Sequence, residues 1–257
     1  MSRLKAAKRG LSLVSDPAEW KLRVQLAAAY RVADYVGWNE LIYTHISARV
    51  PGPQHHFLIN PYGLAFDEVT ASNLVKIDVD GNPVGKSEFT ANKAGFIIHS
   101  AIHAARPDAT CVWHMHTLAG MAVSAQEAGL LPVHMYSHNF WNRLSYHDFE
   151  GPSMRLGERE RLVRSLGSHA ALILRNHGLL TVGKTIAEAF IRFWRLNRAC
   201  EVQLAAQGSR LRVPSPEVCE SSFQMGEEFL ADQADVGELE FAALVRKIEA
   251  RDASYKN

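Results

Sequence analysis

The sequence predicts an α/β fold with a mixed sheet. Segments whose apolar residues recur three and four positions apart alternate with shorter apolar runs bounded by Gly, Pro and Asn, which is the pattern of helices alternating with strands. The run "NLVKIDVDGNPVG" contains the pair Asp80-Gly81, which is typical of a tight hairpin turn. Because a hairpin joins antiparallel strands, part of the sheet must be antiparallel, and a doubly wound parallel sheet is excluded.

Two of the expected helices begin at clear caps. Residues 16–36 start with Asp16 and Pro17, a capping residue followed by the residue type favoured at the first helical position. Residues 185–207 start with Thr185 and Glu188, the spacing of a capping box. Further helices are expected at residues 91–105, 118–129, 217–230 and 238–252.

The expected strands are short and lie between these helices. Residues 37–52 contain "YTHISAR", in which polar residues alternate on one face, and residues 55–63 form a strand interrupted at Asn60-Pro61. Another strand is expected at 110–116. Residues 171–183 read as two buried strands around an Asn-His-Gly turn.

Size and charge restrict the function. The 257 residues suit a single domain, 1–257, in which residues 208–257 form a C-terminal extension with a weaker pattern. The net charge of +1 gives no electrostatic case for a nucleic-acid or membrane partner, and the apolar runs are too short to span a bilayer. No apolar signal core follows the basic start "MSRLKAAKRG", so the cytoplasm is the expected compartment. Three widely spaced cysteines argue against a disulfide framework or a thiolate zinc site.

Two histidines flank a methionine at the end of an apolar run, "CVWHMHT". Alternate residues of a strand share a face, so His114 and His116 are expected to point the same way. Neutral imidazole is a common ligand of divalent transition metals, and a catalytic zinc typically takes three protein ligands. His177, in the Asn-His-Gly turn, is the best third ligand. The alternative is that these are half-buried histidines whose nitrogens bond to backbone groups.

The stretch "NKAGFIIHSAIHAARPDATCVWHMHTLAGMAVSAQEAGLLP" and the later "ALILRNHGLLTVG", with "THISAR" and "NPYG", resemble the class II aldolase and adducin family from about Trp20 to about Gln207. The resemblance implies a three-layer α/β/α fold with a central mixed, largely antiparallel sheet. It also implies a divalent metal on His114, His116 and His177, with zinc as the first choice and manganese or iron as alternatives. It further implies a ring-shaped homotetramer with the site near a subunit interface.

The resemblance also shows where this chain departs from the aldolases. Their base, a glutamate at the start of the helix before the two histidines, falls at Gly95 here. Glu88 is the nearest upstream carboxylate, and Tyr136 lies at the distance where aldolases place a tyrosine acid that reaches the neighbouring subunit's site. Glu88 and Tyr136 are therefore the candidate catalytic residues. The alternatives are a solvated loop charge for Glu88 and a packing role for Tyr136.

The expected substrate pocket departs too. Thr44 and His45 stand where aldolases have a Gly-Asn pair, Asn60 stands near a family hydroxyl, and Lys93 begins a pair that is Ser-Ser in aldolases. These four residues are the candidate substrate-binding residues. His45 and Lys93 are expected to orient an anionic group by charge.

These expectations favour a metal-dependent carbon–carbon lyase, either aldolase-like or a decarboxylase. It would stabilise an enolate-type intermediate of a small anionic hydroxy-carbonyl or carboxylate substrate. Without the glutamate base, cleavage of ketose phosphates, the carbohydrate chemistry of the aldolases, is expected to be weak or absent. Two alternatives remain: an iron-dependent oxygenase on the same fold, and a non-catalytic adducin-like scaffold of the actin-cytoskeleton type.

Overall fold

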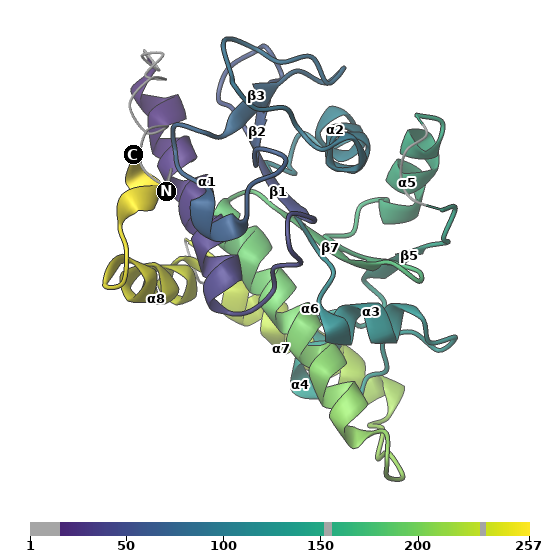
Figure 1. The fold of residues 1–257 in the computed structure, drawn as a ribbon. Coiled ribbons are helices and arrows are strands. Elements are labelled where there is room, and N and C mark those ends of the chain that lie inside the picture. Colours follow the sequence, from purple (N-terminus) through teal and green to yellow (C-terminus); the bar gives the residue numbers. More distant parts are fainter. Residues whose placement is uncertain (1–15, 152–155, 232–234) are drawn as a thin grey trace.

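In the computed structural model, which describes residues 16–151, 156–231 and 235–257, a seven-stranded sheet lies between two layers of helices (Figure 1). The strand order is β3-β2-β1-β4-β7-β6-β5, and every neighbouring pair is antiparallel except β5 and β6. The predicted three-layer fold with a mixed, largely antiparallel sheet is confirmed. The strands are β1 (His45–Arg49), β2 (Phe57–Ile59), β3 (Val75–Ile77), β4 (Cys111–Met115), β5 (Leu144–His147), β6 (Ala171–Leu174) and β7 (Gly178–Gly183).

Helices α2 and α5 cover one face of the sheet, and α1, α3 and α6 lie against the other (Figure 1). Both predicted caps are present: the Asp16 carboxylate accepts from the Ala18 amide, and the Thr185 hydroxyl accepts from the Glu188 amide. The helices are α1 (Pro17–Tyr35), α2 (Lys93–Ala105), α3 (Leu118–Ser124), α4 (Met135–His138), α5 (Glu158–Leu166), α6 (Ile186–Ala206), α7 (Pro216–Ala231) and α8 (Glu238–Glu249), with 3-10 turns η1 (Phe66–Glu68) and η2 (Ser254–Lys256).

The alternation of β4 divides the core between the two layers. Cys111, Trp113 and Met115 belong to the large apolar cluster with α1 and α6, whereas Val112 belongs to a smaller cluster with α2 and α5. The Trp113 indole contacts a group of aromatic rings that includes Trp38. Because side chains alternate along a strand, His114 shares the face of Val112 and points toward the α2 layer. The aromatic side of the core thus fixes the strand that presents the first histidine.

Several elements differ from the sequence-based expectations. The hairpin is reduced to a single bridge between Ile77 and Pro83, because the Asp78 carboxylate accepts from the Asp80 and Asn82 amides and closes the turn early. The helix expected at 118–129 ends at Ser124. Short helix α4 and elements β5 and α5 were not expected. Helices α7 and α8 are confirmed.

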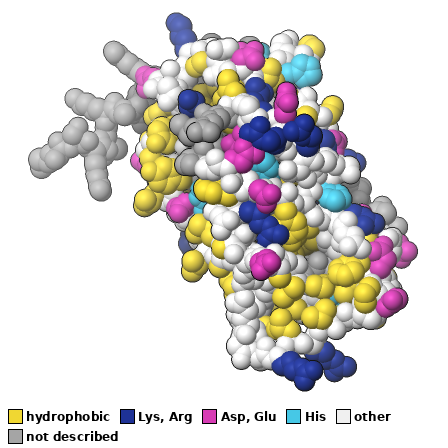
Figure 2. Space-filling model, turned by 90° about the vertical axis from the view of Figure 1, so that its right-hand side faces the viewer, with side chains coloured by type: hydrophobic (Ala, Val, Ile, Leu, Met, Phe, Trp, Pro, Cys, Tyr) yellow, Lys and Arg dark blue, Asp and Glu magenta, His cyan; other side chains and the backbone are white. Residues whose placement is uncertain are grey.

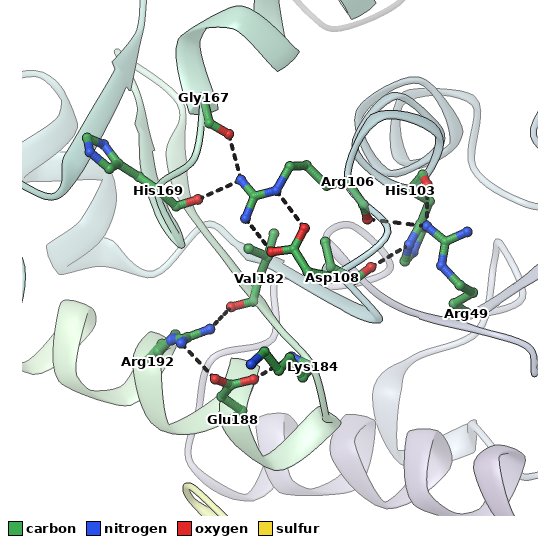
Figure 3. A network of polar contacts seen from close by, with 11 residues as sticks. Arg49, His103, Arg106, Asp108, Gly167, His169, Val182, Lys184, Glu188 and Arg192 are labelled. Atoms are coloured by element: carbon green, nitrogen blue, oxygen red, sulfur yellow. Dashed lines mark hydrogen bonds and ion pairs between the residues drawn. The ribbon is translucent and has the colours of Figure 1, made fainter. Parts of the chain in front are cut away.

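A polar network ties the elements at the end of the sheet where β4 begins (Figure 3). The Arg106 guanidinium pairs with Asp108 and donates to the carbonyls of Gly167 and His169 at 2.6 and 3.1 Å. On the neighbouring β1, Arg49 donates to the carbonyl of His103. These bonds join β1 to α2, and the α2–β4 connection to the α5–β6 connection. Arg192 makes a matching link on α6 by donating to the carbonyl of Val182.

The helices and the surface charge bear on membrane and nucleic-acid binding. Within the described ranges, no helix is both long and apolar enough to cross a membrane. Figure 2 shows one face of the molecule, on which Lys and Arg side chains lie among Asp and Glu side chains and hydrophobic side chains form several patches. Neither sign of charge dominates this face, so it has no broad basic surface of the kind that binds nucleic acid.

Candidate metal centre

Three histidines from two strand ends meet on the α2 side of the sheet. His114 lies in β4, His116 follows directly after it, and His177 lies in the turn between β6 and β7. One nitrogen of each ring lies within 4.8 Å of the others. The antiparallel register between β4 and β7, in which Met115 pairs with Leu179, brings the turn of His177 beside His116. The structure therefore brings together the three histidines expected to bind metal.

The outer nitrogens of two rings are held by the protein. His114 Nδ1 lies 2.9 Å from the carbonyl oxygen of Leu179, and His116 Nδ1 lies 2.5 Å from a Glu40 carboxylate oxygen. Both partners are acceptors, so each Nδ1 donates a proton to its partner and each Nε2 is directed inward. The two Nε2 atoms are 3.1 Å apart, close enough for both to bind one cation.

The third ring is placed by backbone contacts around an unusual turn. Asn176 has a φ of 55°, a left-handed conformation that asparagine tolerates. Its amide donates to the carbonyl of Ser124, while the His177 amide donates to the Ser124 hydroxyl. A Cβ on Gly178 would lie 2.7 Å from the carbonyl oxygen of Met115. Glycine is therefore required for β7 to begin this close to the end of β4.

Burial keeps the rings of His114 and His177 neutral. Desolvation, followed by the nearby histidines, lowers the pKa of His114 well below its ordinary value. The same causes lower the pKa of His177 to about 4. Neutral imidazole is the form that binds a metal, so these two rings are ready to bind at neutral pH.

The nitrogen set fits a divalent transition metal. Nitrogens bound to tetrahedral zinc lie about 3.3 Å apart, given bonds of about 2.0–2.1 Å. The 3.1 Å between His114 and His116 is close to this spacing, and His177 supplies a third nitrogen from another element. A set of three histidines also leaves coordination positions open, as catalytic sites require.

His45 fills the space beside Gly95. A Cβ on Gly95 would lie 2.6 Å from the His45 ring, and that ring stacks on His114 with centroids 5.6 Å apart. Burial lowers the pKa of His45 to about 3, so its ring is neutral at physiological pH. The role of His45 in orienting an anion by charge stays a prediction, although burial of the ring disfavours its charged form. The neutral imidazole of His45 thus occupies the space next to Gly95.

Behind His45, a chain of hydrogen bonds crosses the α2 layer. His103 Nδ1 lies 3.0 Å from the carbonyl of Ala109, and the Ser47 hydroxyl lies 2.7 Å from His103 Nε2 and 2.6 Å from His99 Nδ1. Because the carbonyl fixes the proton on His103 Nδ1, Ser47 donates to Nε2 and accepts from His99. His99 Nε2 is then a buried acceptor with no partner, and its ring meets His45 edge-on at 5.2 Å.

Tyr30 positions Asn60 and the start of β1, next to Thr44. The Tyr30 hydroxyl accepts from the Ile46 amide at 2.7 Å and contacts Asn60 Oδ1 at 2.9 Å, so one buried phenol fixes the ends of β1 and β2. The Nδ2 of Asn60 and the hydroxyl of Thr44 are buried and have no partner. Thr44 has a φ of 66°. A β-branched residue in this region costs about 1–3 kcal/mol, which is typical of functional sites.

The other three sequence candidates lie farther out. Lys93 is exposed at the start of α2, two residues from Gly95. Glu88 is exposed in the preceding loop, and no hydrogen bond or ion pair among the described residues joins it to the three histidines. Tyr136 lies half-buried in α4, where its ring contacts His134. Within one chain, neither Glu88 nor Tyr136 is brought to the histidines by any recorded contact.

Glu40, Ser124, Tyr30 and Ser47 position the site, yet none was expected to do so. Ser47 had a signal, because it alternates with His45 on a strand. Tyr30 and Ser124 lie in helical segments, where they fit an ordinary helical pattern. Glu40 lies in a loop, 76 positions from the ring it contacts.

The chain matches the model of the family described as "Class II Aldolase and Adducin N-terminal domain" over residues 24–204. A solved aldolase II superfamily protein from Pseudomonas syringae is 48% identical with a TM-score of 0.87, covering 94% of this chain and 97% of that one. The L-fuculose 1-phosphate aldolase from Glaciozyma antarctica PI12 is 29% identical with a TM-score of 0.81, covering 100% and 97%.

Adducins are also similar. Rattus norvegicus alpha-adducin is 47% identical over 201 residues, which are 77% of this chain and 27% of that protein. The family model spans most of the chain and includes His114, His116 and His177. The chain belongs to the class II aldolase and adducin family.

Proposed function

We propose that this protein is a metal-dependent carbon–carbon lyase that acts on a small anionic hydroxy-carbonyl or carboxylate substrate. The convergence of three histidine nitrogens, with the outer nitrogens of two rings held by acceptors, carries the proposal. A divalent metal, zinc in the first instance, would be held by His114, His116 and His177. When bound, it would act as a Lewis acid toward developing oxyanion charge.

Three protein groups at the ends of β1, β2 and α2 would contact the substrate. The Thr44 hydroxyl and the Asn60 amide are buried without partners, so a substrate oxygen would satisfy them. Lys93 would add a positive charge at the N-terminus of α2, where backbone amides already favour an anion. Burial of the polar groups strengthens each contact, because little water competes.

Gly95 favours one of the two reactions in this class, decarboxylation, over retro-aldol cleavage. Glycine has no proton-transfer group, and His45 occupies the adjoining space. A decarboxylation does not require a base to deprotonate a substrate hydroxyl, so it tolerates this loss better than a retro-aldol cleavage. Proton transfer falls to Tyr136 or Glu88. Tyr136 would act in the neighbouring subunit's site, which requires the proposed homotetramer.

The first experiment is a metal assay followed by a substrate screen. Purified protein is expected to hold about one zinc or manganese per chain. It should turn over a hydroxy- or aromatic carboxylate faster than fuculose or ribulose phosphate. Ketose-phosphate cleavage at a normal rate of about 1–10³ s⁻¹ would show that another residue is the base. A monomer in light scattering at micromolar concentration would exclude the role proposed for Tyr136.

The second candidate is an adducin-like scaffold, which the 47% identity to alpha-adducin favours. It predicts a protein that holds no metal and has no turnover. The iron oxygenase predicts iron in place of zinc and consumption of dioxygen. The metal assay therefore separates all three.

A further inference from the structure

Glu40 contacts the metal centre from a loop outside the sheet. The loop between α1 and β1 folds back on itself through a bridge between Glu40 and Tyr43, with Leu41 in the left-handed region. This turn places the Glu40 carboxylate 2.5 Å from Nδ1 of His116. The contact joins residues 76 positions apart. It is the one recorded ion pair, within the described part of the chain, between a carboxylate and the three histidines.

The contact at Nδ1 of His116 affects the opposite nitrogen of the same ring, Nε2. A carboxylate that accepts the Nδ1 proton fixes the tautomer and the ring orientation, and it makes Nε2 a stronger donor to a metal. Three histidine rings bring no negative charge to a divalent cation. Glu40 is thus placed to supply negative charge through His116.

We propose that Glu40 is a positioning residue of the metal centre, which acts through His116 to set metal affinity. The inference rests on the proposed function, since it requires that the three histidines bind a metal. Glu40 itself does not touch the metal. Its role differs from that of His114, whose Nδ1 bonds to a neutral backbone carbonyl.

A purely structural role predicts a different outcome. The Glu40 side chain is 40% exposed, and exposed ion pairs contribute little to stability. Loss of the carboxylate should therefore leave the metal-free fold nearly as stable as before. A role through His116 would instead lower metal affinity and alter the ligand field of the bound ion.

The test compares Glu40→Gln, Glu40→Asp and a charge-matched control, Glu127→Gln, which removes an exposed carboxylate after α3. Zinc affinity is measured by competition with a chromophoric chelator, and the visible spectrum of the cobalt(II) form reports the ligand field. Glu40→Gln is expected to bind zinc about 10–100-fold more weakly and to shift the cobalt bands. Glu40→Asp keeps the charge with a shorter reach and should fall between Glu40→Gln and the wild type. Glu127→Gln should match the wild type in both measurements.

The outcomes separate the two proposals. If the wild type binds no zinc, the proposed function fails and this inference fails with it. If the wild type binds zinc and a folded Glu40→Gln binds it within twofold, with unchanged cobalt bands, only this inference is overturned. Circular dichroism and thermal melts of the metal-free proteins establish folding. If Glu40→Gln does not fold, Glu40→Asp decides, because an affinity equal to the wild type would overturn the inference.

Discussion

The polar groups at the two ends of β4 differ in how fully they are hydrogen-bonded. At its start, the Arg106 guanidinium pairs with Asp108 and with carbonyls from the α5–β6 connection (Figure 3). At its other end, where His114 lies, buried polar atoms of Thr44, His45 and Asn60 have no partner. Both ends belong to the same strand and the same sheet.

This difference is what the proposed function predicts, with a polar network at one end and a binding site at the other. Buried polar groups in proteins are nearly always bonded, so each exception calls for a physical reason. Three of these exceptions, on Thr44, His45 and Asn60, lie toward the end of β4 that presents the histidine nitrogens. Arg49 Nε at the opposite end also lacks a partner, although its guanidinium donates to the carbonyl of His103. Under the proposed function, a bound ligand would satisfy the polar atoms at the histidine end, and the network around Arg106 would contribute to stability.

The largest expected effect is a loss of zinc affinity at the histidine end of β4. His114→Ala removes one of three nitrogens, and zinc affinity should fall by more than the about 10–100-fold typical of losing an outer partner. Zinc content after dialysis and a chelator competition measure the loss.

The contrasting variant at the paired end is Arg106→Ala. It leaves the carbonyls of Gly167 and His169 without their donor, which should lower the free energy of unfolding by about 1–3 kcal/mol in urea denaturation. Zinc affinity should remain that of the wild type. A large loss of zinc in Arg106→Ala would mean that the two ends are not separate.

The second effect concerns the pair His45 and Gly95. Glu at position 95 would force its Cβ into the His45 ring, so Gly95→Glu should destabilise the protein by about 1–3 kcal/mol and should gain no aldolase turnover. The double variant Gly95→Glu with His45→Asn frees this space and should recover much of the stability. Thermal melts and a ketose-phosphate assay test both. Turnover in the single variant would show that His45 moves aside readily.

The third effect is a pH dependence of the metal-free protein. Burial lowers the pKa of His103 to about 3, while the unfolded chain takes up the proton near the ordinary pKa of about 6.5. The unfolded state therefore binds more protons between these values, and the free energy of unfolding falls as pH drops from about 6.5 toward 3. Urea melts across this range should show a steeper fall for the wild type than for His103→Asn. Equal slopes would show that His103 is not responsible.

The features predicted correctly from the sequence are those encoded by a few neighbouring residues. The spacing of His114 and His116 and the Asn-His-Gly turn are both visible within a few residues, and the caps at Asp16 and Thr185 are too. The link between Glu40 and His116, by contrast, depends on how a loop folds back over a strand end. The contact of His45 with Gly95 depends on how α2 packs on β1.

Strand β5 and helix α5 were not predicted from the sequence for a similar reason. Strand β5 has only four residues and pairs in parallel with β6, so its position follows from a crossover and not from a local turn. Helix α5 is short and rich in charge, and its apolar residues Leu162 and Leu166 gain meaning only from the cluster with α2 that they fill. Tertiary packing selected these elements where the local pattern was weak.

The smallest expected effect is a change in KM from the charge of Lys93 near the histidine end of β4. Lys93 is exposed at the first turn of α2, where its charge adds to that of the helix N-terminus. A single exposed charge contributes about 0.2–1 kcal/mol, so Lys93→Ala should raise KM for an anionic substrate by at most about fivefold and leave kcat unchanged. Because exposed charges are screened by salt, this increase should shrink at high ionic strength. Lys247→Ala, which removes an exposed lysine on α8, is the matched control and should leave KM unchanged. A fall in kcat without a change in KM would place Lys93 in the chemical step and not in substrate binding.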